Sequence, residues 1–248
     1  IEDEYKQVKA QITHLEDLLA NPHKILALIQ DDMRELSEKF GVPFIVDYRD
    51  VWIDNPFHYF PTKFHRNYCI KLENEILNKS RKIIVTSRTT KELLIKRYGI
   101  VSYDDIVIVP HGYDTDDFEP YKDVTPNAAK FTITHSGLFQ DNRTPKYFLK
   151  ALSEFINKNK IEPGRLEARF VGIMRKNHLK MIGKYNLQGY VNITGFQNHS
   201  DVIRNIMQSD VLWMYLDDTV RSPGKLYEYI GARKPLLLCV SEGEMRRT

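Results

Sequence analysis

Short apolar runs alternate with helix-forming stretches along most of this 248-residue chain. The runs are the length of single strands, and between them apolar residues recur every three or four positions, as on one face of a helix. Parallel strands need a long crossover, usually a helix, between them, so this alternation is typical of a parallel sheet covered by helices. The sequence therefore predicts an α/β protein with Rossmann-like organisation in both halves.

The pattern places the individual elements. In the first half we expect helices at 5–19, 24–40, 66–78 and 89–98, and strands at 42–50, 83–87 and 105–110. In the second half we expect strands at 131–134, 166–171, 191–194, 211–215 and 235–240, with helices opening near Pro145, Asn177, Asn198 and Lys225.

Local signals predict how some of these helices begin and end. Gly41 is expected to close the second helix in the left-handed conformation. Thr89 and Glu92 have the spacing of a capping box, in which both side chains bind free N–H groups of the next helix. Residues 119–130 are polar and contain two prolines, so we expect a linker there, between domains at 1–122 and 123–248.

The composition excludes several classes of protein. The longest apolar run, 235–240, is far shorter than the ~20 residues of a membrane-spanning helix. A net charge of +3 without a dense basic stripe argues against nucleic-acid binding. No signal peptide opens the chain, which predicts a cytoplasmic location, and Cys69 and Cys239 are expected to be reduced core residues. Neither a Gly-x-Gly-x-x-Gly fingerprint nor a Walker loop is present, which disfavours NAD enzymes and P-loop NTPases.

A cation and a carboxylate mark the last predicted helix. Lys225 and Glu228 are three residues apart and therefore lie on the same helix face. At the mouth of an α/β sheet, next to a helix N-terminus, such a pair suits a ligand that carries both phosphate and hydroxyl groups. The spacing alone favours the alternative of an ordinary surface ion pair, and the case for a ligand site depends on other segments of the chain.

Five segments in order resemble the family-4 glycosyltransferases, two-domain GT-B enzymes that move sugars from nucleotide donors. The resemblance covers most of the chain from Gly41 onward, and Pro223–Pro235 resembles the pattern P-x-K-L-x-E-Y-L-A-x-G-K-P. The other four segments are Asp47–Trp52, which resembles D-F-R-D-P-W of a bacterial surface-polysaccharide branch, Val109–Phe118, Ser136–Pro145 with Arg143, and Gly195–Asp210.

The resemblance implies roles for particular residues. Arg143 and Lys225 match residues that hold the donor diphosphate, where fixed cations stabilise the charge that develops on the leaving group. Gly137 and Leu138 match a loop whose backbone N–H groups approach that phosphate. Glu228 matches the second Glu of the Glu-x7-Glu motif, which accepts hydrogen bonds from the ribose hydroxyls.

Two positions leave alternatives open. The first Glu of the motif falls at Val220, so either this branch dispenses with it or Asp217 or Asp218 takes its place. On the N-terminal side, Asp50 is a candidate for the acceptor site as a catalytic carboxylate, or else it is the ion-pair partner of Arg49.

The resemblance also implies an activity. It predicts a retaining transferase that needs neither a metal nor a cofactor and moves a sugar from a UDP- or GDP-linked donor to a hydroxyl of a glycan or lipid-linked acceptor. The two sheets would face each other across a cleft, with the N-terminal domain and the C-terminal helices incomplete here. Peripheral association with the inner face of the membrane would fit such an acceptor. The alternative is a non-catalytic GT-B-like scaffold in polysaccharide assembly, which Val220 favours.

Some polar and aromatic residues allow either a functional or a structural interpretation. His111 and His135 are each a cleft residue or an ordinary structural histidine, and Trp52 and Tyr59 either stack on a sugar ring or plug a loop. The aspartates at 114, 116 and 117 have the spacing of an Asp-rich turn rather than of a metal site.

Overall fold

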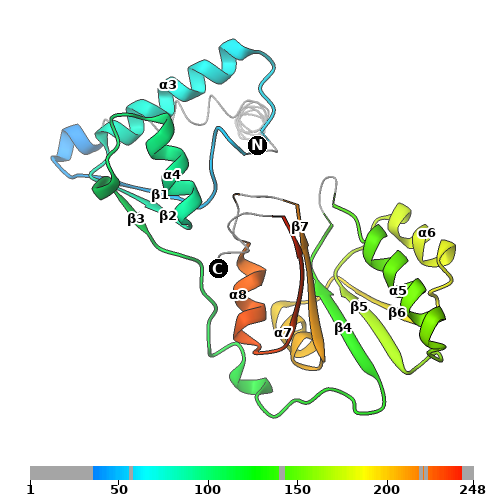
Figure 1. Cartoon of the computed structure of the whole chain (residues 1–248). Coiled ribbons are helices and arrows are strands. Elements are labelled where there is room, and N and C mark those ends of the chain that lie inside the picture. The colour runs from blue at the N-terminus through cyan, green and yellow to red at the C-terminus, as the bar shows by residue number, and fades with distance from the viewer. Residues whose placement is uncertain (1–35, 56–57, 140–142, 218–219, 221–222, 242–248) are drawn as a thin grey trace, which may run out of the picture. The chain divides into compact units, whose positions relative to one another are not determined.

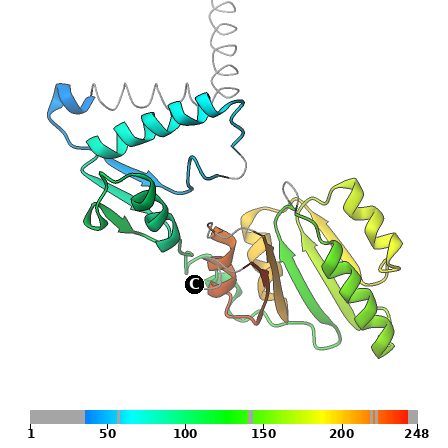
Figure 2. The same cartoon turned by 45° about the horizontal axis from the view of Figure 1, so that its top comes forward.

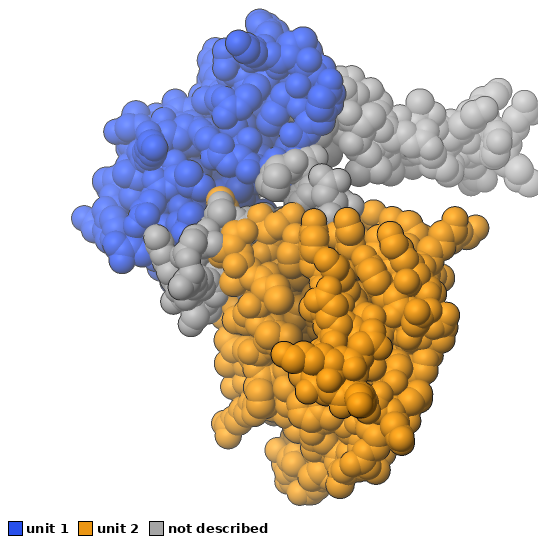
Figure 3. Space-filling view, turned by 45° about the vertical axis from the view of Figure 1, so that its right-hand side comes forward, with its two compact units in different colours: residues 1–110 blue, residues 111–248 orange. Residues whose placement is uncertain are grey.

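The structure is a computed structural model that describes residues 36–55, 58–139, 143–217, 220 and 223–241. The helix predicted at 5–19 and most of the one at 24–40 lie outside these residues. Residues 36–40 are helical and end at Gly41, whose φ of +61° confirms the predicted left-handed position. The chain forms two compact units, Ile1–Pro110 and His111–Thr248, which Figure 3 colours blue and orange.

Unit 1 contains a parallel three-stranded sheet in the order β1-β2-β3 (Figure 1). The crossovers between its strands contain helices, as the sequence pattern predicts. The elements are β1 (Ile45–Tyr48), α3 (Lys63–Lys79), β2 (Lys82–Val85), α4 (Arg88–Arg97), the short 3-10 helix η1 (Tyr103–Asp105) and β3 (Ile106–Ile108).

The start of α4 differs from the prediction. The side chain of Ser87 accepts a hydrogen bond from the Thr90 N–H at 3.1 Å, so Ser87 is the cap and the prediction of a capping box at Thr89 is wrong. The reason is that β2 ends at Val85, two residues before the predicted end of the strand at 87, so the helix cap also lies two residues earlier. Ser87 is still extended, with a φ of −147°, as a cap residue must be.

A buried carboxylate stands in the core of unit 1. Glu73 of α3 is 1% exposed and accepts hydrogen bonds from the hydroxyls of Tyr48 and Tyr98. Burial raises the pKa of Glu73, and the two hydroxyls oppose that rise by stabilising the ionised form. Cys69 is buried nearby, as predicted.

Unit 2 contains a parallel five-stranded sheet in the order β6-β5-β4-β7-β8. This order runs outward from the central strand β4 first to one side and then to the other, which is the doubly wound arrangement of Rossmann-like domains. The elements are β4 (Phe131–Ser136), α5 (Lys146–Asn159), β5 (Leu166–Val171), α6 (Lys176–Lys184), β6 (Val191–Gly195), α7 (His199–Met207), β7 (Val211–Leu216), α8 (Gly224–Gly231) and β8 (Leu236–Val240).

Two apolar clusters cover the two faces of this sheet. Side chains along a strand alternate between faces, so Trp213 of β7 packs with α5 and α6 while Leu212 and Met214 pack with α7 and α8. Figure 2 shows α5 and α6 on one side of the sheet and α7 and α8 on the other. The Asn198 side chain accepts from the Asp201 N–H at 2.9 Å, which confirms the predicted cap of α7.

Residues 111–124 belong to unit 2 by their contacts. Phe118 and Tyr121, the latter in the 3-10 helix η2 (Glu119–Tyr121), pack against the α7–α8 cluster. The boundary between the units therefore lies between Pro110 and His111, before the stretch predicted as the linker. Cys239 is exposed, so its prediction as a core residue is wrong, because β8 is an edge strand of the described sheet.

Candidate functional site

The order of the strands in unit 2 creates a switch point between β4 and β7. These two strands are neighbours, but their connections lead to opposite sides of the sheet. Open α/β sheets bind ligands outside the carboxyl ends of the strands at such a point. Here β4 ends at Ser136 and is followed by Gly137, Asp217 follows β7, and α8 begins at Gly224. The predicted site residues of the second half are therefore on elements that reach this edge.

Lys225 reaches from α8 to the end of β4. Its Nζ donates a hydrogen bond to the Ser136 carbonyl oxygen at 2.7 Å. Burial and the positive charge of Arg143 together lower the pKa of Lys225 to about 8, although the negative charge of Glu228 acts in the opposite direction. An anion that binds next to this buried lysine would stabilise its charged form.

Gly137 follows β4 and lies close to the Lys225 side chain. Its φ is +102°, and a Cβ atom there would be 2.6 Å from the Nζ of Lys225. Its N–H donates to the Val171 carbonyl oxygen at 2.7 Å, so this N–H is already engaged within the protein. Gly172 has a φ of +138° and crosses nearby, since its Cβ would be 3.0 Å from the Gly137 carbonyl oxygen. Gly172 needs to be glycine to let the two chain segments pass, and the positive φ values of Gly137 and Gly172 both favour glycine.

Arg143 lies at the same edge. Its Nε is 3.8 Å from Oδ1 of Asp217, and its side chain is 15% exposed against 49% for the aspartate. The positive charge of Arg143 lowers the pKa of Lys225, as expected of two cations at the same edge of the sheet. Asp217 therefore stands in the candidate site, while Asp218 lies outside the described residues and Val220 offers only an apolar side chain.

Tyr229 attaches α8 to the end of β4, a role that the sequence analysis missed. Its buried hydroxyl accepts a hydrogen bond from the Ser136 N–H at 2.7 Å. Burial raises the pKa of Tyr229 to about 12, so the phenol stays protonated. The available signal was the spacing, because Tyr229 is four residues after Lys225 and shares its helix face.

Glu228 has a neighbour that the sequence analysis also missed. Its Oε1 is 3.3 Å from Nε2 of His199, the first residue of α7. The other ring nitrogen of His199 is 3.8 Å from Oδ2 of Asp117. The asparagine cap of α7 and the motif around Asp117 were both visible in the sequence, but nothing there joined them to Glu228.

In unit 1, Asp50 is exposed just after β1 ends. Arg49 pairs with Asp47 at 3.2 Å, which is not the partner that the structural alternative for Asp50 required. The role of Asp50 on the acceptor side therefore stays a prediction. Trp52 packs against the core of unit 1, whereas Tyr59 is 82% exposed.

The other ambiguous residues have structural contacts. His135 is buried on β4, where its Nδ1 is 3.0 Å from the Trp213 carbonyl and burial lowers its pKa to about 3, so the ring is neutral. The His111 ring contacts the edge of Tyr227. Asp114 accepts from the Asp116 N–H at 2.9 Å, as in the predicted turn.

Two features are absent from the described residues. No three His, Cys, Asp or Glu side chains among them are grouped so that they would hold a metal ion. Within the same ranges, no helix combines the length and the apolar character that crossing a membrane requires.

Short stretches of the chain match a protein of another kind. One subunit of the DNA gyrase of Brachyspira hyodysenteriae is 51% identical over 41 residues, and its counterpart in Dehalogenimonas lykanthroporepellens is 50% identical over 38 residues. The first match covers 16% of this chain and 5% of the gyrase polypeptide. A match of this extent says nothing about the rest of the chain.

Solved structures of glycosyltransferases share the fold. HepE of Anabaena, in complex with UDP and glucose, is 15% identical with a TM-score of 0.64, over 91% of this chain and 59% of that protein. A glycosyltransferase from Rickettsia africae is 18% identical with a TM-score of 0.59, over 88% and 62%. WaaG, a glycosyltransferase of lipopolysaccharide biosynthesis, is 15% identical with a TM-score of 0.57, over 83% and 61%. The chain thus spans about three fifths of each of these proteins.

The model of one protein family matches the N-terminal part of the chain. That family is described as Glycosyltransferase Family 4, and the match covers residues 3–117. The parallel sheets of both units and the doubly wound order in unit 2 agree with the shared fold. Residues 3–117 are thus similar to Glycosyltransferase Family 4, and the chain has the fold of the GT-B glycosyltransferases.

Proposed function

We propose that unit 2 binds a nucleotide sugar at the switch point and that the protein transfers the sugar to an acceptor hydroxyl. The observation that carries this proposal is the placement of Lys225 and Arg143, two cations from different segments, at the carboxyl end of β4 and β7. A diphosphate is the ligand that matches two neighbouring cations. The HepE structures that contain UDP or UDP-glucose support the same choice for a protein of this fold.

The two cations suit the departure of a diphosphate. Negative charge grows on this leaving group as the bond to the sugar breaks, and cations already in place stabilise that charge without reorganising. Arg143 presents a planar fork that binds two phosphate oxygens at once, whereas Lys225 acts as a point charge. Asp217, at 3.8 Å from Arg143, holds the guanidinium loosely enough for a phosphate to become its main partner.

The remaining residues complete the donor site. Glu228 accepts hydrogen bonds from the ribose hydroxyls, and the loop with Gly137 and Leu138 lies along the diphosphate. In this proposal the donor is UDP- or GDP-linked, the acceptor is a glycan or a lipid-linked hydroxyl, and Asp50 serves the acceptor side. Retention of configuration, a reaction without metal or cofactor, and a position at the inner face of the membrane follow from the family resemblance.

Calorimetric titration with UDP, GDP and ADP tests the donor site. We expect one nucleotide to bind selectively, and Arg143→Ala and Lys225→Met each to weaken it by about tenfold or more, or about 1.4 kcal/mol. Lys150→Ala is the control, because Lys150 is an exposed cation of α5 that pairs only with Glu154 among the described residues. The affinity of Lys150→Ala for the selected nucleotide should equal that of the wild type.

Catalysis needs a separate measurement. Incubation with the sugar form of the selected nucleotide and candidate glycan acceptors should release free nucleotide in proportion to glycosylated product, and NMR of the product reports its anomeric configuration. A folded protein that binds none of the three nucleotides would refute the donor site. Binding without turnover with any acceptor would favour the scaffold alternative.

A further inference from the structure

The ring of His199 lies between two carboxylates that come from different parts of unit 2. Nε2 is 3.3 Å from Glu228 Oε1 on α8, and Nδ1 is 3.8 Å from Asp117 Oδ2 in the segment that enters the unit. His199 itself is the first residue of α7, behind the cap residue Asn198. Three separate chain segments therefore meet at one imidazole.

We propose that His199, held by Asp117, is a positioning residue that orients the carboxylate of Glu228 toward the ribose hydroxyls of the donor. This inference rests on the proposed function, because it concerns the same nucleotide site. It adds a determinant of affinity that does not itself touch the ligand.

The need for such a residue follows from the chemistry of glutamate. A long side chain loses rotamer freedom when a ligand immobilises it, so a Glu that is already held in place binds hydroxyls more tightly. The neighbouring cation does not hold Glu228, since the Nζ of Lys225 is directed to the Ser136 carbonyl. His199 occupies Oε1 of Glu228, which leaves Oε2 to accept a hydroxyl hydrogen bond.

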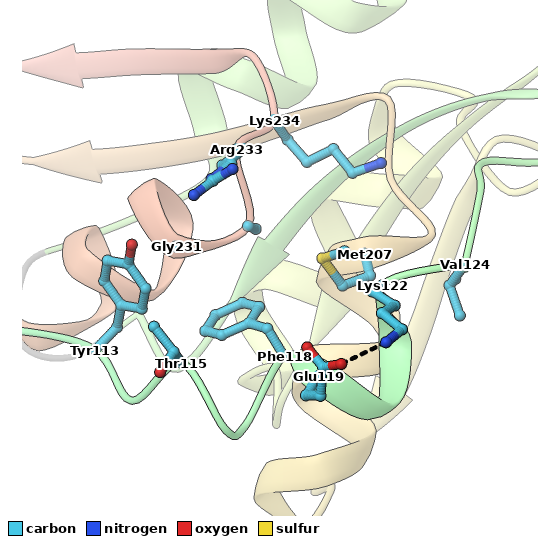
Figure 4. A pocket seen from close by; sticks show the side chains of 11 residues that line it. Tyr113, Thr115, Phe118, Glu119, Lys122, Val124, Met207, Gly231, Arg233 and Lys234 are labelled. Carbon is cyan, nitrogen blue, oxygen red and sulfur yellow. Dashed lines mark hydrogen bonds and ion pairs between the residues drawn. The ribbon is translucent and has the colours of Figure 1, made fainter.

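The backbone that carries Asp117 is well fixed. Phe118 packs against the α7–α8 cluster. The ring of Tyr113 lies against Gly231, where a Cβ atom would be 2.6 Å from the ring (Figure 4). Because the backbone of Asp117 is fixed, its contact with His199 restricts the orientation of the imidazole ring. A supporting residue keeps a binding geometry constant in this way. An isolated surface ion pair has no such support.

Two substitutions at His199 separate its two contacts. His199→Gln places an amide nitrogen close to the position of Nε2 and keeps the donor toward Glu228. His199→Asn places it close to Nδ1, on the side of Asp117, and removes the contact with Glu228. The side chain is 53% exposed, so neither change should affect folding. A thermal unfolding curve for each variant verifies this.

The measured quantity is the preference for ribose hydroxyls, as the ratio of the dissociation constants of 2′,3′-dideoxy-UDP and UDP. We expect a ratio of about ten or more in the wild type, a ratio near one in Glu228→Ala, and a ratio within about twofold of the wild type in His199→Gln. His199→Asn should lower the ratio severalfold while leaving the affinity for the dideoxy nucleotide unchanged. Asp117→Ala should lower it less.

The outcomes separate the two proposals. If the wild type binds UDP with a hydroxyl preference that His199→Asn retains, this inference is overturned while the nucleotide site stands. An equal loss of affinity for both nucleotides in His199→Asn would also overturn it, since that is the effect of a general distortion. If the folded wild type binds neither UDP nor GDP, the proposed function fails first.

Discussion

The pKa of Lys225 predicts that nucleotide binding weakens above pH 8. Burial and the charge of Arg143 lower this pKa from 10.5 to about 8, which corresponds to about 3 kcal/mol against the charged form. A bound diphosphate would favour the ammonium and raise its pKa again. Binding above pH 8 must therefore take up a proton, and the affinity must fall as protons become scarce.

The size of the effect follows from the titration of one group. With a pKa of about 8, roughly nine tenths of the Lys225 side chains are charged at pH 7 and roughly one tenth at pH 9. If only the charged form binds the diphosphate, the dissociation constant for UDP rises about tenfold over this range, which is about 1.4 kcal/mol. Without ligand, the same shift makes the free energy of unfolding rise with pH between about 8 and 10.5, because the unfolded chain keeps a proton that the folded protein has lost.

Calorimetry at pH 7, 8 and 9, in buffers with different ionisation enthalpies, measures both the affinity and the proton uptake. Lys225→Met should bind weakly at every pH and show no uptake linked to this group, while Lys150→Ala should follow the wild type. Equal wild-type dissociation constants at pH 7 and 9 would refute this reasoning. If the dissociation constant of Lys225→Met still rises with pH, the titration belongs to another group.

Three further predictions concern residues that shape the two units. Gly137→Ala should lower the free energy of unfolding by about 1–3 kcal/mol in urea titrations, because alanine is strained at a φ of +102°. It should also weaken UDP binding, because the new Cβ would displace the Nζ of Lys225. Tyr229→Phe should cost about 1–3 kcal/mol by leaving the buried Ser136 N–H without its acceptor, whereas a loss below about 0.5 kcal/mol would show that water replaces the hydroxyl. Since the pKa of Glu73 lies above 4.5 in the folded protein, the stability of unit 1 should fall as pH rises through that titration, and Glu73→Gln should remove this dependence in urea unfolding from pH 4 to 7.

The sequence determined the local elements of this protein. The strand predicted at 166–171 is β5 with the same bounds, and Asn198 caps α7 as expected. Both successes have the same cause, because side-chain periodicity and capping depend on residues that are close in sequence. Where two caps competed, the local rule failed, since Thr89 and Ser87 both fit and the end of β2 decided between them.

The site residues were partly visible in advance. Lys225 and Glu228 stood out by spacing and by resemblance, and Gly137 by its place after a strand. The partners of these residues were not visible. Tyr229 bonds to a residue 93 positions away, and His199 approaches one 29 positions away.

Only the tertiary structure decided the order of the strands, the switch point between β4 and β7, and the inclusion of residues 111–124 in unit 2. Alternating strands and helices are compatible with many sheet orders, because each strand carries the same apolar pattern whichever neighbour it has. The chain chooses among these orders by packing side chains that are far apart in sequence. Local patterns therefore specified which residues form strands and helices, and long-range packing specified which of them meet at the site.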